Sequence, residues 1–115
     1  MESLEEMQAA AFEIIAYAGE ARSDFVEAIR EARQENFEQA WKLIQAGQEK
    51  YAKIHQVHSS LIQREARGER LPFSLLLMHA EDQMLTTETI KIMAIEMLEM
   101  YKKMSRAGVG KEASV

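Results

Sequence analysis

The sequence predicts an all-α protein, an antiparallel up-down-up bundle of three helices. Proline occurs once and glycine five times in 115 residues, so long stretches contain no helix breaker. Along these stretches apolar or small residues recur at alternating spacings of three and four, which marks one face of a helix. Polar segments around Asn36 and at EARGERLP divide the chain into three helices of about 30 residues joined by short connections.

The first helix is predicted from Leu4 to Ala32. Ser3 and Glu6 have the spacing of a capping box at its start. Gly19 interrupts the helix, and we interpret it as a site of close helix packing rather than a bend. The predicted buried stripe consists of Leu4, Met7, Ala11, Ile14, Ala18, Ala21, Phe25, Ala28 and Ala32.

The second helix is predicted to follow Asn36, which with Gln39 resembles a second N-terminal cap. It should end near Gly68, because glycine suits a helix C-terminus and Pro72 discourages continuation. The predicted stripe consists of Phe37, Trp41, Ile44, Gly47, Tyr51, Ile54, His58, Leu61 and Glu65.

The third helix is predicted from about Leu75 to Met104, capped by Ser74. Residues 1–104 would form the single domain and 105–115 a flexible tail. One stripe should face the bundle: Ile90, Met93, Ala94, Met97, Leu98, Tyr101 and Met104. A second set is rotated away from it: Leu75, Met78, Leu85, Ile92 and Met100. A helix that is apolar on more than one side needs a second partner, so the sequence favours self-association.

Composition and charge exclude several classes of function. The net charge is −5 with acids and bases intermixed, which argues against nucleic acid as a partner. Cysteine is absent, so neither a disulfide framework nor thiol chemistry is available. No apolar run reaches the roughly 18 residues of a membrane span, and MESLEEMQ is unlike a signal peptide. We therefore expect a cytoplasmic protein.

The candidate chemistry lies in LLLMHAEDQMLTTE, residues 75–88. His79 and Asp82 are three residues apart and share one side of the helix, which Gln83 and Thr86 continue. A histidine beside an acid is more often structural than functional. Here the pair lies near a helix N-terminus after an apolar run, where a neutral imidazole can act as a nucleophile and the helix favours a transferred anionic group.

The other two histidines suggest a metal site only weakly. His55 and His58 share a helical face, but two imidazoles do not complete a metal site. We interpret them as a polar edge and a satisfied core histidine. A metal-dependent bundle enzyme would need more ligands than the sequence offers.

Three blocks of the chain together resemble a known family. SLLLMHAEDQMLTTE is similar to the His-Ala-Gln-Asp-His-Leu-Met-Thr signature of the IIA components of the bacterial sugar phosphotransferase system, lactose/cellobiose family. IIAYAGEARSDFVEAIREAR resembles the first-helix block of that family, and LIQREARGER the end of its second helix. The resemblance extends in order from Phe12 to Met104, and three collinear blocks are more specific than any single motif.

The resemblance implies a homotrimer of three-helix protomers that acts as a phosphocarrier in sugar uptake. His79 would accept a phosphoryl group from the phosphocarrier protein HPr and pass it to a cysteine of the cognate IIB component. The membrane IIC component would then couple the transfer to uptake of a β-linked disaccharide. Asp82 corresponds to a position near the trimer axis, where three carboxylates gather around a divalent cation such as Mg²⁺. No organic cofactor is implied.

Two residues depart from the family signature. Glu81 replaces the usual glutamine and Gln83 replaces the second histidine, so only one imidazole remains in the motif. With Thr86, these two residues are candidate supporting groups for His79. The effect of the added charge at Glu81 depends on its orientation, which the sequence does not give. The alternative hypothesis is a non-catalytic or regulatory oligomerisation module, in which His79 and Asp82 serve only an interface.

Overall fold

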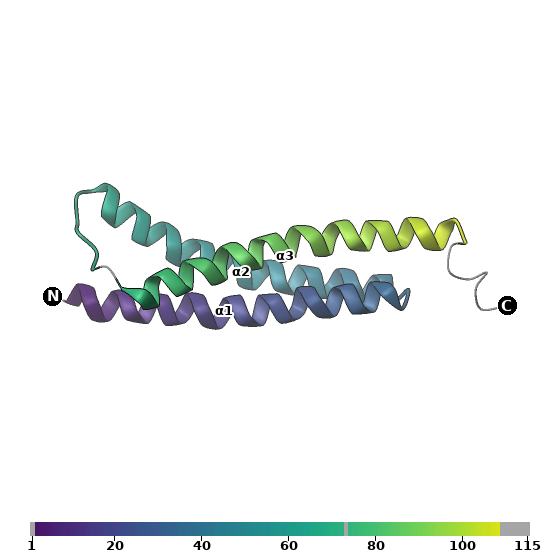
Figure 1. Ribbon diagram of the computed structural model, residues 1–115, viewed down its shortest axis with the longest axis horizontal. Helices are drawn as coiled ribbons and strands as arrows, with labels where there is room; N and C mark the ends of the chain where they lie inside the picture. The colour runs from purple at the N-terminus through teal and green to yellow at the C-terminus, as the bar shows by residue number, and fades with distance from the viewer. Residues whose placement is uncertain (1, 73, 109–115) are drawn as a thin grey trace.

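The structure is a computed structural model that describes residues 2–72 and 74–108, and its three helices form an elongated bundle (Figure 1). Helix α1 spans Glu2–Arg33, α2 spans Phe37–Ala66 and α3 spans Leu75–Arg106. The molecule measures 66 × 20 × 19 Å. Over the described residues it contains helices and no strands, which confirms the predicted all-α class.

The helix ends follow the predicted signals with two exceptions. Ser74 caps α3, its Oγ accepting a hydrogen bond from the Leu77 backbone N–H at 3.0 Å. Gly68 has φ +95°, the left-handed conformation that favours glycine after a helix. Asn36 occupies the predicted N-cap position of α2, but its side chain makes no capping bond, and Nδ2 instead donates to Glu31 Oε2 at 2.8 Å. Helix α3 also ends at Arg106, two residues later than predicted.

Two predicted features lie outside the described part of the chain. The side chain of Ser3, and with it the predicted capping box, is one of them. The other is most of the expected C-terminal tail, residues 109–115.

Helix α1 is the central element because it packs extensively against both α2 and α3, which contact one another much less. Its predicted stripe is confirmed from Met7 to Ala32, where every member is at most 1% exposed. Five of these eight residues are alanines, which allow neighbouring helices to approach closely. Around them lie the buried residues Ala40, Ile44, Ile54, Leu61, Ala80, Met84, Ala94 and Leu98.

Some residues assigned to the predicted stripes are exposed in this protomer: Leu4, Trp41, Glu65 and Met93. Trp41 and Met93 each stand next to a buried alanine, Ala40 and Ala94. Adjacent positions are about 100° apart around a helix, so only one of each pair can face the core. The smaller residue occupies the inner position because the helices are close there.

Gly47, rather than Gly19, is the glycine that close packing requires. A β-carbon at Gly47 would lie 2.6 Å from Cε1 of the buried Phe25 ring, far inside van der Waals contact. A β-carbon at Gly19 would meet nothing within 4 Å, so the predicted close packing at Gly19 is wrong. Gly47 therefore fixes the distance between α1 and α2.

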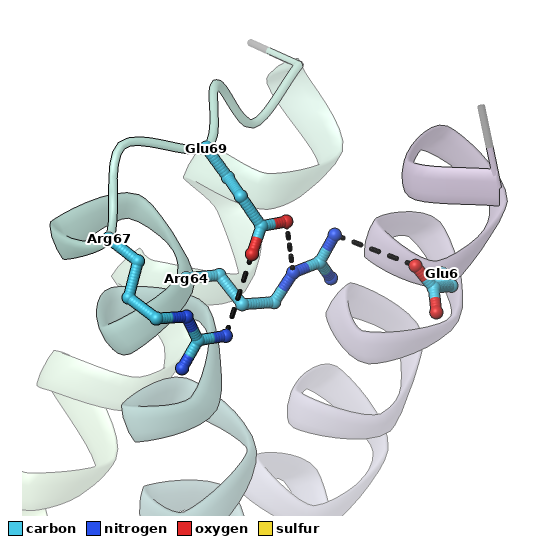
Figure 2. Close-up of polar contacts among 4 residues, drawn as sticks. All are labelled: Glu6, Arg64, Arg67 and Glu69. Carbon is cyan, nitrogen blue, oxygen red and sulfur yellow. Dashed lines mark hydrogen bonds and ion pairs between the residues drawn. The ribbon is translucent and has the colours of Figure 1, made fainter.

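The C-terminal turns of α2 diverge from α1 in the view of Figure 1. A cluster of ion pairs links these turns to α1 and to the segment that follows α2 (Figure 2). Arg64 pairs with Glu69 at 3.1 Å and reaches Glu6 of α1 at 3.5 Å. Arg67 adds a contact to Glu69 at 3.5 Å. The hydrogen bond from Arg64, with a smaller contribution from Arg67, holds the pKa of the Glu69 carboxyl below its ordinary value. None of the helices, as far as they are described, is long and apolar enough to cross a membrane.

Replacing Gly47 with alanine should lower the free energy of unfolding by about 1–3 kcal/mol, because the new methyl group overpacks against Phe25. The matched control is Gly19→Ala, which has space for a methyl group and should raise the free energy of unfolding by about 0.4–1 kcal/mol. Urea unfolding followed by circular dichroism measures both. Equal effects of the two substitutions would contradict the role given to Gly47.

Candidate functional site

The site is built on the first three turns of α3. Ser74 fixes the start of this helix, and His79 follows five residues later with an exposed side chain. An open surface pocket of about 540 Å³ is lined by Leu75, Leu76, Met78, His79 and Asp82. The structure thus brings His79 and Asp82 to one pocket, as the i, i+3 spacing predicted. The other three lining residues are apolar.

Glu81 does not share this pocket, because its carboxylate is held by α2. Glu81 Oε1 lies 2.8 Å from Nε2 of His58, whose side chain is 19% exposed. Residues two apart on a helix point about 200° away from each other, so Glu81 and His79 occupy nearly opposite sides of α3. The negative charge of Glu81 therefore points toward the imidazole of His58 and away from the pocket of His79. The contact also identifies the partner of His58.

Gln83 is held by α1. Nη1 of Arg22 donates a hydrogen bond to Gln83 Oε1 at 2.6 Å, and both side chains are partly buried. Arg22 belongs to the first-helix block of the family resemblance, and its position in the sequence does not reveal this contact. The side chain of Thr86 is exposed, whereas that of the neighbouring Thr87 is buried, with Oγ1 donating to the carbonyl of Ala18 at 3.5 Å.

Further polar contacts hold α2 beside this segment. Tyr51 donates to the carbonyl of Met84 at 3.4 Å and to Glu88 Oε2 at 3.3 Å. Burial, followed by the negative charge of Glu88 and this hydrogen bond, raises the pKa of Tyr51 to about 12. Nζ of Lys91 lies 5.1 Å from the Tyr51 ring centroid, within cation–π range.

A second ion pair, besides Arg64–Glu6, joins α2 to α1. Nζ of Lys50 lies 2.7 Å from Asp24 Oδ2, and this hydrogen bond raises the pKa of Lys50. The bridge lies between helices that the Phe25–Gly47 contact already holds close. It therefore fixes the register of α2 against α1.

The described part of a single protomer contains no group of three side chains arranged to hold a metal ion. His55 is exposed and His58 is engaged with Glu81, so these two do not act as a ligand pair here. Asp82 is an exposed carboxylate with aliphatic neighbours. Its oxygens have the chemistry of a hard-cation ligand, but one protomer supplies only this one carboxylate.

A family model and individual relatives of known name all match the chain to the same family. The family model for the lactose/cellobiose-specific IIA subunit of the phosphotransferase system (PTS) matches residues 9–102. A lactose-specific EIIA component of Staphylococcus epidermidis is 37% identical over 99 residues, covering 86% of this chain and 95% of the relative. The lichenan-specific phosphotransferase enzyme IIA component of Bacillus subtilis is 40% identical over 101 residues, covering 88% and 92%.

Solved structures agree in fold. PtcA from S. mutans superposes with a TM-score of 0.83 at 41% identity, covering 85% of this chain and 96% of that one. The cellobiose-specific enzyme IIA from Bacillus anthracis superposes with a TM-score of 0.85 at 34% identity, covering 87% and 92%.

The His58–Glu81 contact should contribute a coupling free energy of about 0.2–1 kcal/mol, the range of ion pairs near a surface, because Glu81 is half-exposed. Unfolding of wild type, His58→Ala, Glu81→Ala and the double variant gives this coupling directly. Strict additivity of the two single substitutions would mean that the contact does not form in solution.

Proposed function

The chain belongs to the lactose/cellobiose-specific IIA family of the phosphotransferase system, and we propose that it carries a phosphoryl group on His79. A subunit of this family has a general role in phosphotransfer linked to sugar transport. The donor in this proposal is HPr and the acceptor is a cysteine of the cognate IIB component. The protein would work in the cytoplasm beside the membrane IIC component during uptake of a β-linked disaccharide.

The single observation that carries this proposal is the accessibility of His79. Its imidazole is exposed and lines an open pocket, whereas His58 is engaged with Glu81. A docked partner can therefore reach His79 without rearrangement of the bundle. An exposed imidazole can be placed in line with a donor or acceptor on a docked partner, and positioning is the main requirement of phosphoryl transfer.

Each transfer is a substitution at phosphorus. In the first, an unprotonated ring nitrogen of His79 forms a P–N bond while the bond between phosphorus and HPr breaks. In the second, the P–N bond breaks while phosphorus bonds to the sulfur of IIB. The phosphoryl group moves intact, so neither step requires an oxidant or a reductant.

We also propose that three protomers assemble through the outward face of α3. Leu75, Met78, Leu85, Ile92 and Met100 are all exposed, with Leu75 at 79%. Within this set Met78, Leu85 and Ile92 repeat every seven residues, and Leu75 and Asp82 form a second column at the same interval. Two columns of residues with a seven-residue repeat are typical of helices that pack lengthwise against copies of themselves.

Asp82 would lie within this seam, so three copies would meet at the trimer axis. Three adjacent carboxylates repel one another and retain protons unless a cation compensates their charge. Mg²⁺ prefers oxygen ligands, and the exposed Asp82 carboxylate fits that preference. The ion would neutralise the axis, and no step of phosphoryl transfer passes through it.

Incubation with phosphoenolpyruvate, enzyme I and HPr should convert the wild-type protein into an acid-labile phosphoprotein. His79→Gln should abolish labelling, because the nucleophilic nitrogen is lost. His55→Gln is the matched control and should label like wild type, since His55 lies on α2, outside the pocket of His79. Labelling of His79→Gln at the wild-type level would refute the assignment. An unlabelled but trimeric wild type would instead favour the oligomerisation module.

Asp82→Leu should preserve or strengthen the trimer and remove any requirement for a divalent cation, because an axial charge is exchanged for apolar contact. Sedimentation with and without a chelator measures both effects, with Glu49→Leu as the control on the exposed surface of α2, outside the proposed seam. Dissociation of Asp82→Leu into monomers would place Asp82 away from the axis.

A further inference from the structure

A cation of α1 reaches the same side of α3 that carries His79. Arg22 is partly buried, and its Nη1 donates to the neutral amide oxygen of Gln83 at 2.6 Å. Among the side chains that the structure describes, no carboxylate forms an ion pair with Arg22. Partial burial of a guanidinium without a counter-charge is unfavourable, so bundle stability alone does not account for this placement. An anion beside Arg22 would account for it.

The orientation of Gln83 follows from the chemistry of its partner. A guanidinium has only donors, so Gln83 must present its amide oxygen to Arg22. The amide nitrogen of Gln83 therefore keeps two N–H groups that can donate elsewhere. Gln83 lies four residues after His79, so the two side chains are neighbours on one face of α3, with Cβ atoms about 5–6 Å apart.

We propose that Arg22 and Gln83 form the anion-binding part of the site, which holds the phosphoryl group while it is attached to His79. This inference rests on the proposed function. Formation of the P–N bond places the negatively charged phosphoryl oxygens beside His79 as the bond to HPr breaks. The guanidinium supplies the compensating positive charge, and the Gln83 amide supplies a neutral donor. Both stabilise the phosphorylated form relative to the free imidazole.

Glu81, although close to Gln83 in sequence, does not compensate the charge of Arg22. Glu81 is paired with His58 on the side of α3 that faces α2. Arg22 contacts α3 one turn beyond His79, on the side that faces α1. The position that has histidine in the family signature is thus occupied here by a glutamine that is held by a cation.

The experiment measures the equilibrium of the phosphoryl group between HPr and this protein. Arg22→Met should shift the equilibrium toward HPr by about tenfold or more, because a charged hydrogen bond to the phosphoryl group is lost. Arg22→Lys should recover part of the shift, since it retains the charge without the planar fork. Arg30→Met is the matched control and should stay within twofold of wild type, because Arg30 is exposed on α1 and forms its ion pair with Glu27 of the same helix.

Gln83→Glu separates this role from a purely structural one. The new carboxylate would pair with Arg22, so thermal stability of the unphosphorylated protein should be retained or increased while the positive charge is neutralised. Phosphorylation should then fall about tenfold or more, as for Arg22→Met. If Arg22 serves only to join α1 to α3, Gln83→Glu will phosphorylate like wild type, and the proposal is overturned. It is also overturned if Arg22→Met leaves the equilibrium within twofold of wild type.

Failure of the underlying function gives a different result. In that case the wild type itself remains unlabelled by HPr, and the proposal falls together with the role of His79. A wild type that is labelled, with variants at Arg22 and Gln83 that are labelled equally well, overturns the anion-binding role alone.

Discussion

The structure depends on the packing of both other helices against the alanine-rich stripe of α1. Small side chains on this stripe bring the helices close together, and the Phe25–Gly47 contact sets the distance between α1 and α2. Because α1 supplies eight of the sixteen buried hydrophobic residues in the described part of the chain, α3 needs only a narrow face for the core. That face consists of Ala80, Met84, Thr87, Ala94 and Leu98. The rest of α3 remains available for an exposed histidine and an apolar seam.

This arrangement points three consecutive polar side chains of α3 in three different directions. Glu81, Asp82 and Gln83 differ by about 100° per step around α3. Glu81 meets His58 of α2, Gln83 meets Arg22 of α1, and Asp82 remains exposed beside His79 in the pocket. Each residue therefore has its own surroundings although all three are adjacent in the sequence. The two departures from the family signature are also the two positions held by side chains of other helices.

Most of the fold could be predicted because its signals are local. Spacings of three and four identified nearly all of the α1 stripe, and Ser74 and Gly68 marked ends that the structure confirms. These failures concern which residue of a helix faces a closely packed neighbouring helix. Trp41 and Met93 are exposed because adjacent alanines face the core, and Gly47 has the packing role assigned to Gly19. Such choices depend on the distance to a neighbouring helix, which periodicity does not contain.

The sequence by itself determined the helical class, the elements, the family resemblance and the common side of His79 and Asp82, since these follow from residue type and spacing along one helix. Only the tertiary structure decided that Glu81 turns to His58, that Arg22 reaches Gln83, and that His79 lines an open pocket. The partners in the first two contacts are 23 and 61 residues apart in the chain. Their meeting depends on how three helices are rotated and offset against one another, and that geometry is set by core packing rather than by any local pattern.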